Sequence, residues 1–186
     1  MLKASVFVGT SVDGFIARAD GALDWLPDDP EEHGYEAFMA SVDVLVIGRN
    51  TYDTVLGFGT WPYGAKPVIV LTHRPLPSPL PAGAHVESLA ASPAEVAATL
   101  AARGFRHAYV DGGIVVQQFL RAGLIQTLTI TRIPRLLGSG IPLFGALPKD
   151  VILRHVRTTQ YPSGLVSSVY AIDTEQRHPP RAPGAG

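Results

Sequence analysis

Residues 43–48, DVLVIG, form an apolar run that ends in glycine and is followed by Arg49, Asn50 and Thr51. Glycine lets the backbone approach a ligand closely, and the free amides at the start of a helix favour an anion. Arginine adds a two-pronged hydrogen-bond donor for phosphate. The segment from Gly48 to Thr51 is therefore a candidate phosphate site. A plain strand-to-helix turn, with Asn50 or Thr51 as the N-cap, explains the same residues equally well.

A second apolar run begins at Lys66 and ends in Leu71-Thr72-His73-Arg74. A hydroxyl, an imidazole and a guanidinium in succession can bind a terminal phosphate, and such residues usually distinguish a 2′-phosphate from a bare ribose hydroxyl. The alternative is the start of a solvated loop.

A third run ends in Asp111-Gly112-Gly113 and leads into an apolar segment at 114–123. Paired glycines at such a turn allow a pyrophosphate or a nicotinamide to lie against the backbone. A tight turn between strand and helix is the alternative. The chain contains no G-x-G-x-x-G pattern, which argues against a standard Rossmann domain.

The elements that must position these segments alternate along the chain, which predicts an α/β sheet, mostly parallel, with an antiparallel pair at its C-terminal end. Ligands of open α/β sheets bind beyond the carboxyl ends of the strands, so we expect the three segments to meet there. The predicted strands span 3–9, 43–48, 66–73, 85–89, 106–113, 124–133, 151–160 and 165–173. The predicted helices span 30–41, 49–56, 92–104 and 114–123, the third with Ser92 and Glu95 as a capping box.

The remaining segments are predicted to be irregular. Residues 11–30 carry two Asp-Gly pairs and two prolines, which predicts a long loop, and 75–83 is too rich in proline for a helix or a central strand. Residues 1–173 are expected to form one domain, followed by a disordered tail at 174–186.

Composition excludes several classes of function. The chain has no cysteine, and its six histidines lack metal-ligand spacing, so we expect no metal site. A formal net charge of −1 gives no reason to expect nucleic acid or an anionic membrane as partner. The N-terminus lacks the apolar region of a signal peptide, and no apolar run is long enough to span a bilayer, which predicts a cytoplasmic protein.

Several motifs, in one consistent order, resemble the dihydrofolate-reductase-like superfamily, and most closely the C-terminal reductase domain of bacterial riboflavin-biosynthesis deaminase–reductases. The motifs are SVDGFIA (11–17), LDWL (23–26), VIGRNTY (46–52), VLTHRP (70–75), VDGG (110–113), QFL (118–120) and PRLLGSGIPLF (134–144). The resemblance implies a three-layer α/β/α sandwich, NADPH as cofactor, a small pyrimidine or pterin-like substrate, and a homodimer formed through the C-terminal strands.

The resemblance also assigns roles to particular residues. It implies that the cofactor is bound by Gly48, Arg49, Asn50 and Thr51 at its phosphates, by Leu71, Thr72, His73 and Arg74 around its 2′-phosphate, and by Asp111, Gly112 and Gly113 beside the nicotinamide and pyrophosphate.

On the substrate side, Ser11, Asp13 and Gly14 match the family's S-x-D-G element, and residues 136–140 match a glycine turn. Asp13 is the expected polar substrate contact or proton relay, with a simple Asp-Gly turn as the alternative. Trp25 is expected near the nicotinamide end of the cleft, with a core tryptophan as the alternative.

The resemblance implies an NADPH-dependent reductase that converts a ribosylamino-pyrimidine to its ribitylamino form. A dihydrofolate or pterin reductase is the second hypothesis, for which a carboxylate from the acidic residues at 28–32 would have to reach the substrate. The same acids at a helix N-terminus are explained by the helix dipole. A nucleotide-binding module without turnover is the third.

Overall fold

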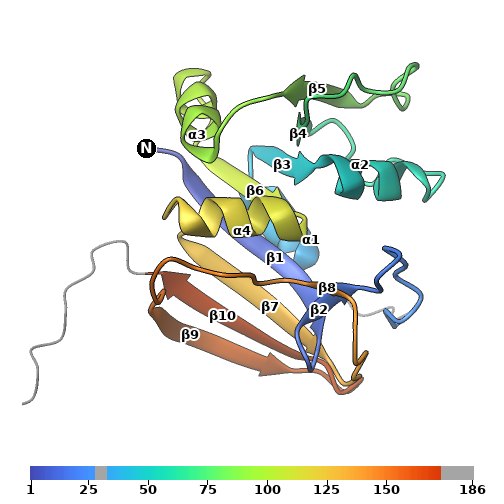
Figure 1. Ribbon diagram of the computed structural model, residues 1–186, viewed down its shortest axis with the longest axis vertical. Helices are drawn as coiled ribbons and strands as arrows, with labels where there is room; N and C mark the ends of the chain where they lie inside the picture. The colour runs from blue at the N-terminus through green and yellow to red at the C-terminus, as the bar shows by residue number, and fades with distance from the viewer. Residues whose placement is uncertain (28–32, 173–186) are drawn as a thin grey trace, which may run out of the picture.

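Eight strands form one twisted sheet in the order β5-β4-β3-β6-β1-β7-β10-β9 (Figure 1). The structure is a computed structural model that describes residues 1–27 and 33–172. The strands from β5 to β7 in this order are parallel, whereas β10 runs antiparallel to both β7 and β9. The strands are β1 (Lys3–Ser11), β3 (Val44–Gly48), β4 (Pro67–Leu71), β5 (His85–Leu89), β6 (His107–Asp111), β7 (Thr127–Ile133), β9 (Leu153–Gln160) and β10 (Val166–Ile172).

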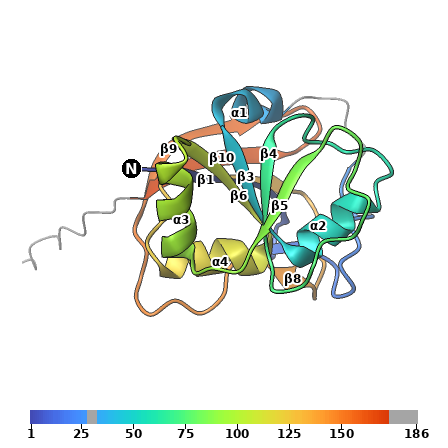
Figure 2. The same cartoon turned by 90° about the horizontal axis from the view of Figure 1, so that it is seen from above.

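Helices cover both faces of the sheet, which makes a three-layer sandwich (Figure 2). They are α1 (Tyr35–Ser41), α2 (Arg49–Leu56), α3 (Pro93–Ala102) and α4 (Gly113–Arg121). Val44 and Val46 of β3 belong to the core cluster that contains α3 and α4 side chains, and Leu45 and Ile47 belong to the one that α1 and α2 cover. Because both faces of β3 are buried, its sequence is a continuous apolar run. The predicted mostly parallel sandwich with an antiparallel C-terminal pair is confirmed.

The capping box predicted for the third helix is present. The Glu95 amide donates to Ser92 Oγ at 3.4 Å, and the Ser92 amide donates to Glu95 Oε2 at 2.8 Å. By contrast, α1 begins only at Tyr35, after Gly34 with φ of 84°. The predicted helix start at Pro30, with Glu31 and Glu32, lies outside the described residues, as does the predicted tail.

The segment predicted as a long loop contains a short strand, which the sequence did not indicate. β2 (Phe15–Ala17) pairs antiparallel with β8 (Ile141–Pro142) as a separate two-stranded sheet. A Cβ at Gly140 would overlap the Ala17 carbonyl oxygen, so this approach requires glycine. The Asp-Gly pairs act locally as turns, whereas β2 depends on a partner far along the chain.

Two further findings concern the residues that the structure describes. None of their helices has the length and apolar character needed to cross a membrane. The same residues contain no group of three or more His, Cys, Asp or Glu side chains that could hold a metal ion.

Candidate cofactor and substrate site

The three candidate strand ends lie side by side at the carboxyl ends of the parallel strands, which we call the carboxyl edge of the sheet. Gly48 at the end of β3 is in register with Leu71 at the end of β4. On the other side of β3, Ile47 is in register with Asp111, the last residue of β6. Since β4, β3 and β6 are parallel neighbours, the segments that follow them leave the sheet at the same edge. The structure therefore brings together three segments that the sequence placed far apart.

Two helices begin at this edge without a side-chain cap. Gly48 is the N-cap of α2, and Gly112 is the N-cap of α4; neither helix has a side-chain cap hydrogen bond at its N-terminus. The suggestion that Asn50 or Thr51 caps α2 is therefore wrong, because both lie inside the helix. The first-turn amides of α2 and α4 remain available to an anion, and the positive ends of both helix dipoles favour one.

The two glycine turns are in direct contact. Gly112 has φ of 92°, and a Cβ built on it would overlap Thr51 Oγ1 and lie 3.7 Å from the Gly48 nitrogen. A side chain at 112 would thus strain its own backbone and push the start of α2 away from the start of α4. This cradle of backbone amides depends on glycine at 112 and could hold an anion such as a phosphate.

Arg49 ties the start of α2 to the segment that follows β4. Its Nε donates to both carboxylate oxygens of Asp53, at 2.8 and 3.0 Å, and its Nη1 donates to the Pro75 carbonyl at 2.9 Å. The side chain is 17% exposed. Arg49 is therefore held in place at the edge of the cradle, and an anion bound there would share it with Asp53.

The segment after β4 presents its polar residues to solvent. Thr72 Oγ1 accepts a hydrogen bond from the Arg74 amide at 3.0 Å, and the Thr72 amide donates to the Leu89 carbonyl at 3.2 Å. His73 and Arg74 are exposed. Thr72 shapes the turn, and the two basic residues lie on the rim, as a contact with a protruding 2′-phosphate would require.

Asp13 joins the loops that follow two other neighbouring strands, β1 and β7. Its carboxylate accepts hydrogen bonds from the amides of Leu137 at 3.1 Å and Gly138 at 2.7 Å. The Ser11 hydroxyl, together with these two amides, lowers the pKa of the Asp13 carboxyl below its usual value. Asp13 is therefore ionised near neutral pH and holds the 136–140 turn in place. A substrate contact or a proton relay through Asp13 stays a prediction.

The predicted substrate segments also reach the start of α4. A Cβ at Gly113 would lie 3.1 Å from Ile16 Cδ1 in β2 and 3.1 Å from the Pro142 carbonyl in β8. The two-stranded β2-β8 sheet therefore lies directly against the Gly112-Gly113 turn. A ligand held at this turn would have the substrate segments as its neighbours.

Trp25 is fully buried and packs with Ile133 and Leu165. Its carbonyl accepts a hydrogen bond from Arg135 Nη1 at 3.0 Å, and its indole Nε1 has no partner among the described residues. The burial agrees with the alternative of a core tryptophan. The expected place of Trp25 near the nicotinamide end of the cleft stays a prediction.

Tyrosines gather around Asp111, a feature that the sequence analysis missed. The Asp111 carboxylate accepts a hydrogen bond from the Gly112 amide at 2.8 Å and interacts with the Tyr109 hydroxyl, and its charge also acts on Tyr35 and Tyr63. Tyr109 lies two residues before Asp111 and so on the same face of β6, a spacing that was available in the sequence. Tyr35 and Tyr63 come from other elements, and no local pattern pointed to them.

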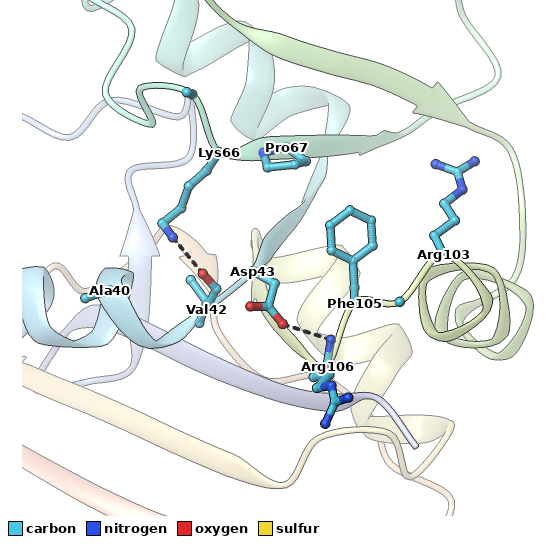
Figure 3. A pocket seen from close by; sticks show the side chains of 10 residues that line it. Ala40, Val42, Asp43, Lys66, Pro67, Arg103, Phe105 and Arg106 are labelled. Atoms are coloured by element: carbon cyan, nitrogen blue, oxygen red, sulfur yellow. Dashed lines mark hydrogen bonds between the residues drawn. The ribbon is translucent and has the colours of Figure 1, made fainter.

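A broad depression of about 760 Å³ lies at the opposite edge of the sheet, at the amino ends of β3, β4 and β6 (Figure 3). Its polar groups are engaged within the fold. Lys66 Nζ donates to the Val42 carbonyl at 2.7 Å, Asp43 accepts from the Arg106 amide at 2.8 Å, and Arg103 pairs with Glu87. The volume suits a ligand, but the chemistry of the predicted site is at the other edge.

Comparison with known proteins agrees with this architecture. The chain is 33% identical over 163 residues, 86% of its length and 92% of the relative's, to the uncharacterized protein YwjB of Bacillus subtilis (strain 168). A crystal structure of a Shewanella sp. PV-4 protein, provisionally assigned to riboflavin biosynthesis, superposes with a TM-score of 0.83 at 36% identity, covering 92% of this chain and 99% of that chain.

The fold is also that of Enterococcus faecalis dihydrofolate reductase, solved in complex with NADP(H) and RAB-propyl. That structure superposes with a TM-score of 0.61 at 18% identity, covering 92% of this chain and 96% of that chain. Residues 3–167 match the family described as the RibD C-terminal domain. This match spans nearly all of the described residues, and the chain also covers 92% of YwjB and 99% of the Shewanella protein. The protein therefore belongs to the RibD C-terminal domain family.

Proposed function

We propose that the protein is an NADPH-dependent reductase of a small heterocyclic substrate, of the riboflavin-pathway type. The observation that carries the proposal is the contact between the uncapped N-termini of α2 and α4, where Gly112 meets Thr51. Membership of the RibD C-terminal domain family supports a riboflavin-pathway reductase, as does the assignment of the Shewanella protein.

The residues at the sheet edge suit each part of the nucleotide. The first-turn amides of α2 and α4 would hold the pyrophosphate, and Arg49 would neutralise part of its charge. Thr72, His73 and Arg74 would surround the 2′-phosphate. When bound, NADPH supplies a hydride, and the protein's part is to hold the substrate beside it and to exclude water.

The substrate would lie between the Gly112-Gly113 turn and the loops that Asp13 joins. A pyrimidine or pterin-like ring has the flat shape and polar edges that backbone amides and carbonyls of such loops can bind. The pterin alternative needs a carboxylate from residues 28–32, which lie outside the described residues. A nucleotide-binding module without turnover is the remaining alternative.

Titration of the purified protein with NADPH and NADH, followed by thermal shift, tests the cofactor. At 100 times the Kd, NADPH should stabilise the protein by about 2.7 kcal/mol and raise the Tm by about 5–11 °C. NADH at the same concentration should have a much smaller effect. Absence of binding by either nucleotide would contradict the proposal.

Turnover separates the alternatives. NADPH oxidation should be faster with the ribosylamino-pyrimidine than with dihydrofolate or other pterins. The reverse order would favour the pterin reductase. Tight NADPH binding with no oxidation in the presence of any of these substrates would favour the binding module.

We further propose that two copies associate through β9. β9 is the last strand at one side of the sheet, and all eight of its residues are exposed. Ile152, just before the strand, is 57% exposed, and Val156, within it, is 51% exposed. The register shift between β9 and β10 at Val169/Tyr170 interrupts regular pairing, so the contact would use side chains more than added strand hydrogen bonds.

Light scattering after gel filtration should give twice the mass of one chain for the wild type. Val156→Glu should yield a monomer, because a charge would be buried in the apolar contact. Leu80→Glu, which changes a similarly exposed leucine in the 75–83 loop, should remain a dimer. A monomeric wild type would overturn the proposed association. The cytoplasmic location stays a prediction that cell fractionation would test.

A further inference from the structure

We propose that Tyr63 determines which substrate the reductase site accepts, by donating its hydroxyl hydrogen to an oxo group on a flat, uncharged ring. The inference rests on the reductase function proposed above, and it narrows the substrate class to rings that carry a carbonyl oxygen. The observation behind it is a buried phenol in a fixed position whose hydroxyl has no partner within the described fold.

The ring of Tyr63 is fixed by the segment between α2 and β4. Trp61 packs perpendicular to it, with ring centroids 5.1 Å apart, and Trp61 Nε1 donates to the Gly64 carbonyl at 3.2 Å. The Tyr63 carbonyl accepts a hydrogen bond from the Lys66 amide at 3.1 Å, which closes the turn before β4. Tyr63 is 8% exposed and belongs to the core cluster that α1 and α2 cover. The position of the ring therefore does not depend on a ligand.

The hydroxyl of Tyr63 differs from that of Tyr109 in the same core cluster. The Tyr109 hydroxyl donates to the Phe7 carbonyl at 2.8 Å. No hydrogen bond joins the Tyr63 hydroxyl to another residue within 1–27 and 33–172. A hydroxyl that is largely removed from water and has no internal acceptor carries a free-energy cost, which a ligand acceptor would remove. Tyr63 can therefore bind such a ligand without first breaking a bond of the fold.

The Tyr63 hydroxyl lies near the carboxyl end of β6. The charge of Asp111 acts on Tyr63, on Tyr35 of α1 and on Tyr109 of β6. Asp111 is partly exposed and directly precedes the Gly112-Gly113 turn, where the nicotinamide is proposed to lie. A substrate ring held beside that turn would therefore have the Tyr63 hydroxyl as a neighbour.

The surroundings of the hydroxyl select the kind of group that it can bind. Burial, with a smaller effect of the Asp111 charge, raises the pKa of Tyr63, so the phenol stays protonated and able to donate at neutral pH. Its titratable neighbours are Asp111, Tyr35 and Tyr109, and none of them can carry a positive charge. An anionic oxygen would lose its hydration here without gaining a cation, and an ionised Asp111 would repel it. A carbonyl oxygen on an uncharged ring accepts the hydrogen bond without this cost.

The contact has a direct consequence for substrate choice. Pyrimidine and pterin-like rings that carry an oxo group would give the Tyr63 hydroxyl its acceptor. The same rings with amino groups in place of oxo groups would leave its proton without one. Sites built to hydrogen-bond one polar group discriminate strongly against analogues that lack it, because the buried group of the protein is then unpaired.

The first test compares the stability of two variants without any ligand. Tyr109→Phe removes the hydrogen bond to the Phe7 carbonyl and should lower the Tm by about 1–6 °C. Tyr63→Phe removes a hydroxyl that has no partner within the described fold, so it should leave the Tm unchanged or raise it. An equal fall in Tm for both variants would overturn the proposal, because the fold itself would then be using the Tyr63 hydroxyl.

The second test uses 5,6-diaminouracil, a flat ring with two oxo groups, added to protein saturated with NADPH. Tyr63→Phe should raise its Kd about 2- to 12-fold, as expected for the loss of one hydrogen bond between uncharged groups. The analogue 2,4,5,6-tetraaminopyrimidine has amino groups in place of both oxo groups, and its Kd should change by less than about twofold. Tyr52→Phe, which removes another buried hydroxyl of the same core cluster, should leave both Kd values unchanged.

The outcomes separate the role of Tyr63 from the proposed function. Equal Kd values of wild type and Tyr63→Phe for 5,6-diaminouracil would overturn that role and leave the reductase function standing. A wild type that binds NADPH and the tetraamino analogue, but not 5,6-diaminouracil, would do the same. If the wild type binds no NADPH, the reductase proposal fails; binding of 5,6-diaminouracil that is weakened in Tyr63→Phe would still support the role of the hydroxyl.

Turnover gives a third readout. With a ribosylamino-pyrimidine that carries oxo groups, Tyr63→Phe should raise the KM by about the same 2- to 12-fold and change kcat less, because the hydrogen bond is made before the hydride moves. A variant with an unchanged KM and a greatly reduced kcat would contradict a binding contact.

Discussion

Gly112→Ala should abolish most of the affinity for NADPH and should also destabilise the protein. The new Cβ would overlap Thr51 Oγ1, and the backbone at 112 has φ of 92°. Backbone strain of this kind costs about 1–3 kcal/mol, which corresponds to a fall in Tm of about 2–12 °C for a chain of this size. Displacement of α2 from α4 would separate the two sets of amides, and we expect at least about a tenfold increase in Kd.

A matched variant separates backbone strain from the loss of the cradle. Gly123 follows α4, has φ of 68°, and has open space where its Cβ would lie. Gly123→Ala should therefore lower the Tm to a similar extent without changing the Kd for NADPH. Adding Thr51→Ala to Gly112→Ala should restore part of the affinity, because it removes the overlapping oxygen. Unchanged NADPH binding by Gly112→Ala would contradict the placement of the nucleotide at this turn.

The strands and helices that meet at the carboxyl ends of the parallel strands could be predicted, because each depends on its own local sequence. Four consecutive apolar residues before Gly48 are typical of a strand buried on both faces, and the glycines after β3 and β6 mark the turns that follow. Because helices connect the strands in parallel, the carboxyl ends of successive strands must lie on the same side of the sheet. The helix at 92–104 was predictable for the same reason, since Ser92 and Glu95 cap it with their own side chains.

The features that were missed depend on residues far apart in the chain. β2 forms only because residues 141–142 pair with it, and no pattern within 11–30 indicates this partner. The amides that Asp13 binds come from a loop more than a hundred residues away, so an Asp-Gly pair could equally be a plain turn. Tyr35 in α1 and Tyr63 in the segment after α2 both lie near Asp111. No local sequence pattern predicts that these residues come together.

The two ends of the parallel strands differ in their charges and helix termini. The depression at the amino edge of the sheet is lined by Lys66, Arg103 and Arg106. Helices α1 and α3 end near it, and cations at helix C-termini are stabilised by the helix dipole without any ligand. At the carboxyl ends of the strands, helices α2 and α4 begin instead of ending, and their uncapped N-termini attract anions.

Arg74→Ala should weaken NADPH much more than NADH, because only NADPH carries the 2′-phosphate that we propose this exposed guanidinium binds. A hydrogen bond to a charged group contributes about 1.5–3 kcal/mol, which corresponds to about a 10- to 150-fold increase in the Kd for NADPH. The Kd for NADH should change by less than about twofold if Arg74 contacts nothing else of the nucleotide. Titration of each variant with both nucleotides at constant ionic strength measures the difference.

Arg49→Ala should behave differently, because Arg49 lies beside the proposed pyrophosphate position and also bridges Asp53 to the Pro75 carbonyl. It should weaken both nucleotides by similar factors, and it should lower the Tm slightly through loss of the bridge. Arg106→Ala, at the amino ends of the strands, removes one positive charge and should leave both affinities unchanged, so it controls for net charge. An equal loss of NADPH and NADH in Arg74→Ala would sink the 2′-phosphate assignment, since a contact that both nucleotides share cannot distinguish them.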